Sequence, residues 1–322
     1  MEQRKIILFG KTAFCITLPQ SWVRKNQLQK GDMLFVQETF RNSLELMPVK
    51  NSPKETAVIE MDITKKSIQD IQAILLAMYL NGYSQIMLWG DNKGKIEAIR
   101  AYVHKLIAAE IMNVTTNKVI INVFWDLDSI NIDSIISRIE NILRSIFTET
   151  AKLIDQKDGL KDITEKGEEV YRQVLLAKRA ITYAVNNSAT AQKFNLSSLE
   201  LYYISYLIHF FGQIGEYIVR IARIIQEAHT DKTITPAIKK ELTSVIYQTL
   251  EYFTKVLESY NKQRKGEQVS LQNFHDFEEK LSLLTKKTLK PAVPLIIEYL
   301  NVLVSKIKDA ELTIINLEHV PK

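Results

Sequence analysis

The fold is decided first by residues 4–32, RKIILFGKTAFCITLPQSWVRKNQLQKGD, in which two alternating apolar runs precede a proline. The alternation predicts two strands joined by a turn at Gly10, namely Arg4–Phe9 and Ala13–Leu18. Pro19 suits the first position of a short helix, Gln20–Asn26, because the N–H that it lacks would be unpaired there anyway.

Two further strands are predicted, Met33–Glu38 and Leu44–Met47, which complete a module over residues 1–50. Strands this few and short expose sheet edges and much of their apolar face, so they cannot close a core alone. A second, interleaved copy would cover those faces. The sequence therefore predicts a β-rich module that pairs with its own copy.

The positive charge of the chain is concentrated in this module. The whole protein has a net charge of +5, and residues 1–30 alone contain six basic side chains and one acidic one. The other 292 residues contain 36 basic and 36 acidic side chains. Such asymmetry is typical of a face that binds a polyanion, and the alternative is a basic fringe that only aids solubility. The basic residues are Arg4, Lys5, Lys11, Arg24, Lys25 and Lys30.

Composition indicates a folded, multidomain, mainly α protein. A chain of 322 residues with 46% hydrophobic residues, 10 Gly and 7 Pro has enough apolar side chains for two or three cores. The single cysteine, Cys15, excludes an internal disulfide, and we expect a packed thiol. No apolar run is long enough for a signal peptide or a membrane span, so we expect a cytoplasmic protein.

Residues 55–126 predict a small domain with the order β-α-β-α-β and its helices on one side of the sheet. No Gly-rich phosphate loop occurs between its strands and helices, so we interpret it as a structural bridge. The predicted elements are strands Ala57–Met61, Ile86–Trp89 and Val119–Phe124 and helices Ser67–Tyr79 and Ile96–Ala109.

Residues 127–322 show helical periodicity alone and predict an antiparallel bundle of two three-helix halves. One predicted helix, Ser197–Ala228, has a stripe of apolar residues at spacings of three and four. The other predicted helices are Ser129–Ile154, Thr164–Val185, Pro236–Tyr260, Leu271–Thr288 and Ala292–Asn316.

Residues 4–32 and the following NSLELMP resemble the swapped-hairpin DNA-binding modules of the AbrB/SpoVT class. The later segments AILLAMYLNGYSQIML (73–88), IRAYVHKLIAAEIMN (99–113) and VIINVFWDLDSINIDSIISRIENILRSIF (119–147) resemble the middle part of archaeal phosphate-uptake regulators. The stretch IHFFGQIGEYIVRIARII (208–225) is similar to a PhoU helix pattern. The resemblance implies a DNA-binding module fused to a PhoU-like bundle.

Metal binding is the property in which the chain departs from this family. PhoU domains that hold metal clusters carry acidic pairs four residues apart on successive helices, where both carboxylates share a face. Here Tyr171 takes the place of an acidic residue, Gly212 precedes Glu216, and Ser305 precedes Asp309. Isolated carboxylates are usually solvated or ion-paired, so we expect no cofactor. If a metal ion does bind, the candidate ligands are Glu168, Glu216, Asp276 and Asp309.

No pattern in the chain predicts catalysis. The five histidines lack the spacing of a zinc site, and no G-x-S-x-G elbow or catalytic Cys/His signature is present. We therefore expect a protein that is not an enzyme.

Two functions remain open at this stage. The first is a DNA-binding transcriptional regulator, linked by the resemblance to phosphate uptake, in which Arg4, Lys5, Lys11, Arg24 and Lys25 face the duplex. In the second, the bundle is a PhoU-like adaptor that docks on a transporter or another protein, and the module only dimerises. In that case the basic side chains merely flank a dimer seam.

Overall fold

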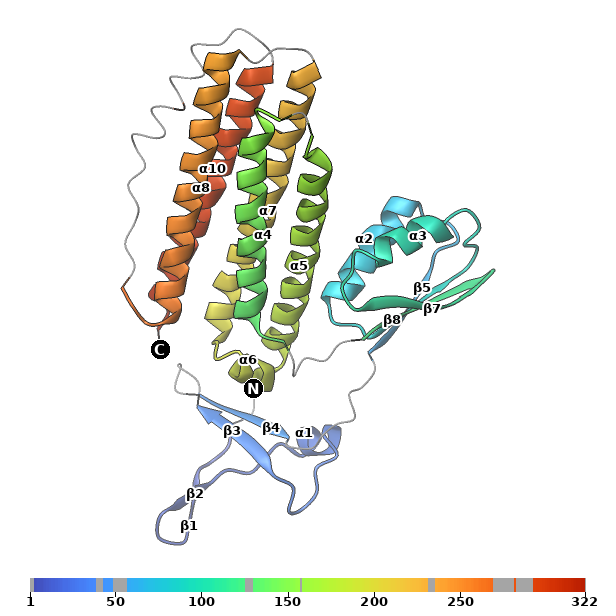
Figure 1. Ribbon diagram of the computed structural model, residues 1–322. Coiled ribbons are helices and arrows are strands. Elements are labelled where there is room, and N and C mark those ends of the chain that lie inside the picture. Colours follow the sequence, from blue (N-terminus) through green and yellow to red (C-terminus); the bar gives the residue numbers. More distant parts are fainter. Residues whose placement is uncertain are drawn as a thin grey trace. The chain divides into compact units, whose positions relative to one another are not determined.

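The computed structural model describes residues 3–38, 43–48, 57–124, 130–156, 158–230, 235–268, 281 and 292–321 (Figure 1). The chain divides into two compact units, residues 1–55 and residues 56–320, which we call the first and second units. Small β-sheets and an α/β region precede a bundle of long helices, and the chain is mainly helical. This agrees with the coarse organisation predicted from the sequence.

The first unit consists of two antiparallel hairpins and one short helix. Strands β1 and β2 pair with Ile7 opposite Cys15, and β3 and β4 pair with Val36 opposite Leu46. Gly10 adopts a φ of +70° in the first hairpin turn, a conformation that glycine reaches without strain. The bounds are β1 Ile7–Phe9, β2 Ala13–Cys15, α1 Gln20–Lys25, β3 Leu34–Glu38 and β4 Leu44–Pro48.

The predicted order of elements in the first unit is confirmed, with Pro19 at the start of α1. The first two strands are shorter than predicted, and the packed environment expected for Cys15 is wrong, because this side chain is exposed. Every residue of β1 and β2 is exposed, since this hairpin has no core of its own in the single chain.

The second unit begins with a four-stranded sheet of order β5-β6-β8-β7, in which β5 and β6 are parallel and the other pairs antiparallel. Helices α2 and α3 lie on the same side of this sheet (Figure 1). Their buried side chains, including Leu75, Tyr79 and Ile99, share one core with Ile86, Leu88 and Ile121 of the sheet. The bounds are β5 Val58–Asp62, α2 Ile68–Leu80, β6 Gln85–Trp89, α3 Ile96–Val103, β7 Ala109–Thr115 and β8 Lys118–Val123.

The predicted helix Ile96–Ala109 is too long, and strand β7 was not predicted. Helix α3 ends at Val103, and Ala108 adopts a φ of +64°, which breaks the helical path. Residues 109–115 then pair with β8 across a hairpin whose last pair is Thr115 and Lys118. The sheet therefore has four strands where the sequence predicted three.

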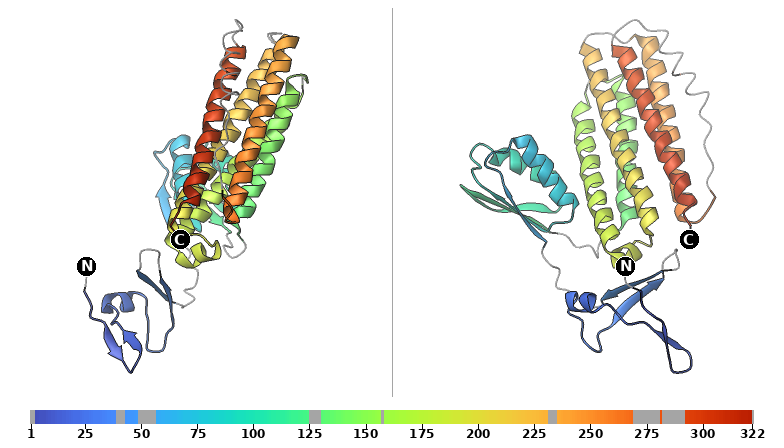
Figure 2. Two further views of the ribbon diagram at one scale, coloured as in Figure 1. Left: turned by 90° about the vertical axis from the view of Figure 1, so that its left-hand side faces the viewer. Right: turned by 180° about the vertical axis from the view of Figure 1, so that it is seen from behind.

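The bundle consists of long helices that lie side by side in all views (Figures 1 and 2). The predicted apolar stripe of α7 is confirmed, because eight of its nine residues are buried and Ile224 is partly buried. The other eight are Ile204, Leu207, Ile208, Phe211, Ile214, Ile218, Ile221 and Ile225. Rings of Phe147, Phe211 and Phe253 join α4, α7 and α8, with centroids 5.7–5.8 Å apart along this chain of contacts. The bounds are α4 Ile132–Leu153, α5 Leu160–Asn186, α6 Ser188–Lys193, α7 Ser198–Thr230, α8 Pro236–Arg264 and α10 Ala292–Glu318.

Two features of the bundle differ from the prediction. Helix α5 begins four residues earlier than expected, after Gly159 with its φ of +132°, and the short helix α6 was not predicted. The predicted helix Leu271–Thr288 lies outside the described residues apart from Leu281, so the division into two three-helix halves stays a prediction. Among the described residues, no helix has a stretch long and apolar enough to cross a lipid bilayer.

Close packing of α5 against α7 depends on glycines. A Cβ atom added to Gly167 of α5 would lie 2.7 Å from a methyl carbon of Val219, nearer than real Cβ atoms approach. A Cβ atom added to Gly215 of α7 would lie 3.1 Å from Val170 and 3.2 Å from Leu143. These residues bring the two helices close together, and the side chains beside them form the cavity described below.

Candidate functional site

The first group of predicted DNA-binding side chains lies on the β1–β2 hairpin. Arg4 and Lys5 precede β1, and the guanidinium of Arg4 donates a hydrogen bond to Thr17 Oγ1 over 3.1 Å, which joins the two open ends of the hairpin. Lys11 lies in the turn between the strands, at the opposite end. The three residues are exposed. The hairpin therefore carries cations at both of its ends.

The second group, Arg24 and Lys25, occupies the last turn of α1, where cations interact favourably with the helix dipole. The helix end is held by Asn26, whose side-chain amide donates to the carbonyl of Trp22 over 2.8 Å. Both cations are exposed. Within the part of the chain that the structure describes, Lys5, Lys11, Arg24 and Lys25 form no ion pair, so their charges are available to a polyanion.

The apolar faces of the first unit are also exposed. None of the described side chains between residues 3 and 48 is buried, and Phe9 and Phe14 are 72% and 74% exposed. Burial of one such side chain contributes about 1.5–3 kcal/mol, so covering half of the set would stabilise the unit by roughly 10 kcal/mol. The set comprises Ile6, Ile7, Leu8, Phe9, Phe14, Ile16, Met33, Phe35, Val36 and Leu44.

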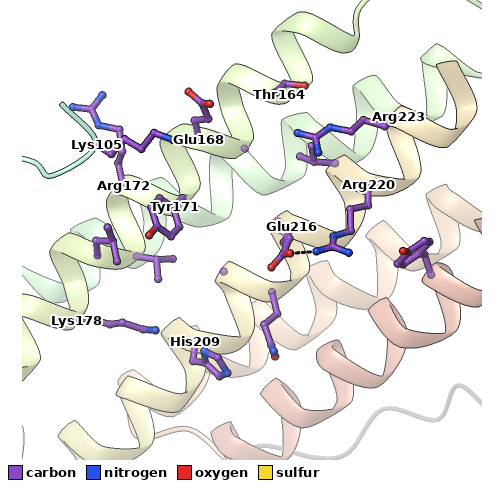
Figure 3. A pocket seen from close by; sticks show the side chains of 18 of the residues that line it. Lys105, Thr164, Glu168, Tyr171, Arg172, Lys178, His209, Glu216, Arg220 and Arg223 are labelled. Carbon is purple, nitrogen blue, oxygen red and sulfur yellow. Dashed lines mark hydrogen bonds and ion pairs between the residues drawn. The ribbon is translucent and has the colours of Figure 1, made fainter. Parts of the chain in front are cut away.

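A separate cluster of charge lines a cavity of about 980 Å³ in the second unit, among α3, α5, α7 and α10 (Figure 3). Two histidines, His104 and His209, and two acidic residues, Glu168 and Glu216, also face it. Five lysines and arginines outnumber the two carboxylates, so the lining is cationic. The five are Lys105, Arg172, Lys178, Arg220 and Arg223.

Only part of this positive charge is neutralised locally. Glu216 accepts a hydrogen bond from Arg220 one turn later on α7, which together with Tyr299 raises the pKa of the guanidinium (Figure 3). Arg172 pairs with Glu169 at 3.3 Å. Among the described residues, Lys105, Lys178 and Arg223 have no ion-pair partner.

The pKa of His209 is lowered in this environment. Burial and the nearby charges of Lys178 and Lys306 lower the pKa of the imidazole below its ordinary value. Burial likewise lowers the pKa of Lys178. The lowered pKa favours the neutral imidazole, so the positive charge of the cavity comes from its lysines and arginines.

The structure brings two of the four predicted metal ligands to one cavity and places a third outside it. Glu168 and Glu216 line the same cavity, but the Glu216 carboxylate is paired with Arg220. Asp309 is paired with Lys306 at 2.8 Å on α10, and Asp276 lies outside the described residues. Over the described ranges, no three His, Cys, Asp or Glu side chains gather as ligands would. A cationic lining disfavours a second cation, and metal binding stays a prediction.

The cationic cavity itself was not predicted. Its charges come from three separate segments, namely the residues just after α3, helix α5 and helix α7, and the net charge of residues 31–322 is zero because acidic residues elsewhere balance them. The i and i+4 spacing of Glu216 and Arg220 was visible but indicates only an ordinary helical ion pair. Comparisons of the chain with family models, curated proteins and solved structures find no match.

Proposed function

We propose that the protein is a DNA-binding transcriptional regulator that dimerises through residues 1–50. Two copies would cover each other's exposed apolar faces and bring ten basic side chains to one assembly. The observation that carries the proposal is the coincidence, in one small unit, of the excess positive charge and an apolar surface without a core. The resemblance to swapped-hairpin modules and to phosphate-uptake regulators supports the same function.

The charges on the hairpin and on α1 would contact phosphates, and those that reach base edges would supply specificity. A dimer that makes six to ten phosphate contacts loses about 10³–10⁵ in affinity between 50 and 200 mM salt. Fluorescence anisotropy with genomic fragments measures this dependence. We expect binding below about 10 µM at 50 mM salt, falling steeply as salt is added.

The double variant Lys11→Ala with Arg24→Ala tests the residues directly. It removes four phosphate contacts from a dimer, so the slope of log affinity against log salt should decrease by about 3.6. The control is Lys161→Ala with Lys240→Ala, which removes the same charge from exposed positions of the second unit. Equal losses in both variants, or no binding by the unmodified protein, would argue against a DNA interface on the first unit.

A second function, that of a protein-binding adaptor, is favoured by an aromatic strip on α7 formed by Tyr202, Tyr206 and Phe210. The rings of Tyr202 and Tyr206 lie 4.9 Å apart, and that of Phe210 lies 6.4 Å from Tyr206. The two tyrosines are 50% and 44% exposed. Half-exposed aromatic side chains with a polar end are common at protein interfaces.

The adaptor function is tested by replacing the strip in the full chain. Tyr202→Ser with Tyr206→Ser should abolish copurification of a transporter or other partner, while DNA binding is unchanged. Tyr247→Ser is the matched control, because Tyr247 is 42% exposed on α8. A partner retained by the double variant would exclude the strip as the docking surface.

A further inference from the structure

We infer that the cavity among α3, α5, α7 and α10 binds a nucleotide-sized organic phosphate. This inference does not rest on the proposed function, because it concerns the second unit alone. It follows from the charge, the size and the apolar walls of the cavity.

Charge defines the ligand as an anion. Lys105 on the segment after α3, Lys178 on α5 and Arg223 on α7 face one concave space, and none has an ion-pair partner among the described residues. Lys178 is partly buried, and burial of its ammonium costs free energy, as its lowered pKa indicates. An anion bound between them would offset that cost through charge-assisted hydrogen bonds.

The position of these cations favours several negative charges on one ligand. Figure 3 shows Lys178 near His209 on one side of the view and Arg220 and Arg223 together on the other. The cations are therefore spread around the cavity and not gathered at one point. A phosphate carries up to two charges and accepts paired hydrogen bonds from a guanidinium, which suits such an arrangement.

Size and apolar walls exclude a bare inorganic ion as the best ligand. The volume of about 980 Å³ lies at the upper end of the range for sites that enclose small organic molecules. The lining also includes the apolar side chains of Val174, Leu175 and Val219 and the ring of Tyr171. An organic body attached to the phosphate would cover these side chains, which water cannot do favourably.

Calorimetric titration of the full chain without DNA tests the inference, with ATP, glucose 6-phosphate, inorganic phosphate and citrate as probes. We expect an organic phosphate to bind at least ten-fold more tightly than inorganic phosphate or citrate. Lys178→Gln with Arg223→Gln should weaken that binding about a hundred-fold, since each lost charged hydrogen bond is worth about ten-fold. Lys161→Gln, an exposed cation of α5 outside the cavity, should change it less than two-fold.

Proton NMR supplies a readout at the site. Binding should shift the imidazole resonances of His209 and leave those of His229, whose ring nitrogen lies 2.7 Å from the carbonyl oxygen of Leu153. The inference is overturned if no probe shifts His209, if citrate or inorganic phosphate binds best, or if the cavity variant and Lys161→Gln behave alike. Because DNA is absent, each of these outcomes leaves the proposed function to its own test.

Discussion

Arg179 of α5 donates a hydrogen bond to the main-chain carbonyl oxygen of Tyr79 near the end of α2, and its guanidinium lies 4.8 Å from the centre of the Tyr79 ring. It also donates to the carbonyl of Tyr83 over 3.0 Å. Burial lowers the pKa of Arg179 to about 10, so the guanidinium stays charged at neutral pH. The side chain thus joins the α/β region to the bundle within the second unit.

Arg179→Ala should lower the free energy of unfolding of the second unit by about 3 kcal/mol, because two carbonyl groups lose a charged donor in a buried place. Arg179→Lys should recover only part of this loss, since an ammonium lacks the planar fork that reaches both oxygens. Urea denaturation measures both. Arg138→Ala, at an ion-paired arginine whose side chain is 61% exposed, should cost less than about 1 kcal/mol. Similar losses at the two arginines would refute the anchoring role.

Gly167→Ala should destabilise the second unit by about 1–2 kcal/mol through overpacking against Val219, although alanine favours an isolated helix by about 1 kcal/mol. In the background of Val219→Ala the same substitution should become stabilising, because the opposing methyl groups are gone. A double-mutant cycle by chemical denaturation gives the coupling between the positions. If Gly167→Ala has the same effect in both backgrounds, the helices do not pack as closely as described.

If two copies pair through the first unit as proposed, Leu8→Asp should convert the dimer to a monomer and abolish the proposed DNA binding, because it places a charge in the apolar face that a second copy would cover. Sedimentation equilibrium and anisotropy titration measure the two effects. Leu312→Asp is the matched control, since Leu312 of α10 is 51% exposed and Leu8 56%. A dimer that persists in Leu8→Asp would place the contact between copies elsewhere.

Asp70 should contribute to stability at neutral pH and lose that contribution in acid. Its carboxylate accepts hydrogen bonds from the hydroxyl and the N–H of Ser67, which lower the pKa of Asp70 below its ordinary value. A carboxyl group whose pKa is lower in the folded state than in the unfolded state stabilises the fold at pH values above its unfolded pKa of about 3.9. This stabilisation is lost as the pH falls through the pKa of the folded state. The unfolding free energies of the wild type and Asp70→Asn should therefore converge as the pH is lowered from 7 towards 3.

Ser67→Ala provides an independent check on the same cap. Without the hydroxyl donor, the pKa of Asp70 should move back towards its ordinary value, which NMR titration of the carboxyl group measures. Glu258→Gln, on the exposed side of α8, controls for the loss of one carboxylate. A difference between wild type and Asp70→Asn that stays constant with pH would contradict the cap as the cause.

Periodicity was sufficient where one face of an element is buried and the other is not. The stripe of α7 from Ile204 to Ile225 was predicted in this way. The start of α1 after Pro19 was predicted from the properties of proline instead, since α1 has no buried residue. Strand β7 was missed because Glu110 and residues 112–115 are exposed at the sheet edge, so no alternation distinguishes this segment from a helix. Its pairing with β8 decides its conformation, and pairing is a tertiary effect.

The residues of the two candidate sites also differ in how far the sequence alone reveals them. Cations adjacent in sequence, as in the first unit, produce a local excess that composition detects. The cations of the cavity are spread over the residues just after α3, helix α5 and helix α7, and Arg179 stands beside Lys178 in a helix where both resemble surface residues. Lys178 lines the cavity and Arg179 is buried against α2 only because α3 and α2 pack against α5. No local pattern distinguishes them.

No described side chain between residues 3 and 48 is buried. This affects how the melting midpoint depends on protein concentration. If a second copy completes the first unit, its melting midpoint must rise with protein concentration, whereas that of the second unit stays fixed. If other parts of the same chain cover it, both midpoints are independent of concentration. In the first case a dilute solution would contain protein with a folded second unit and an unfolded first unit.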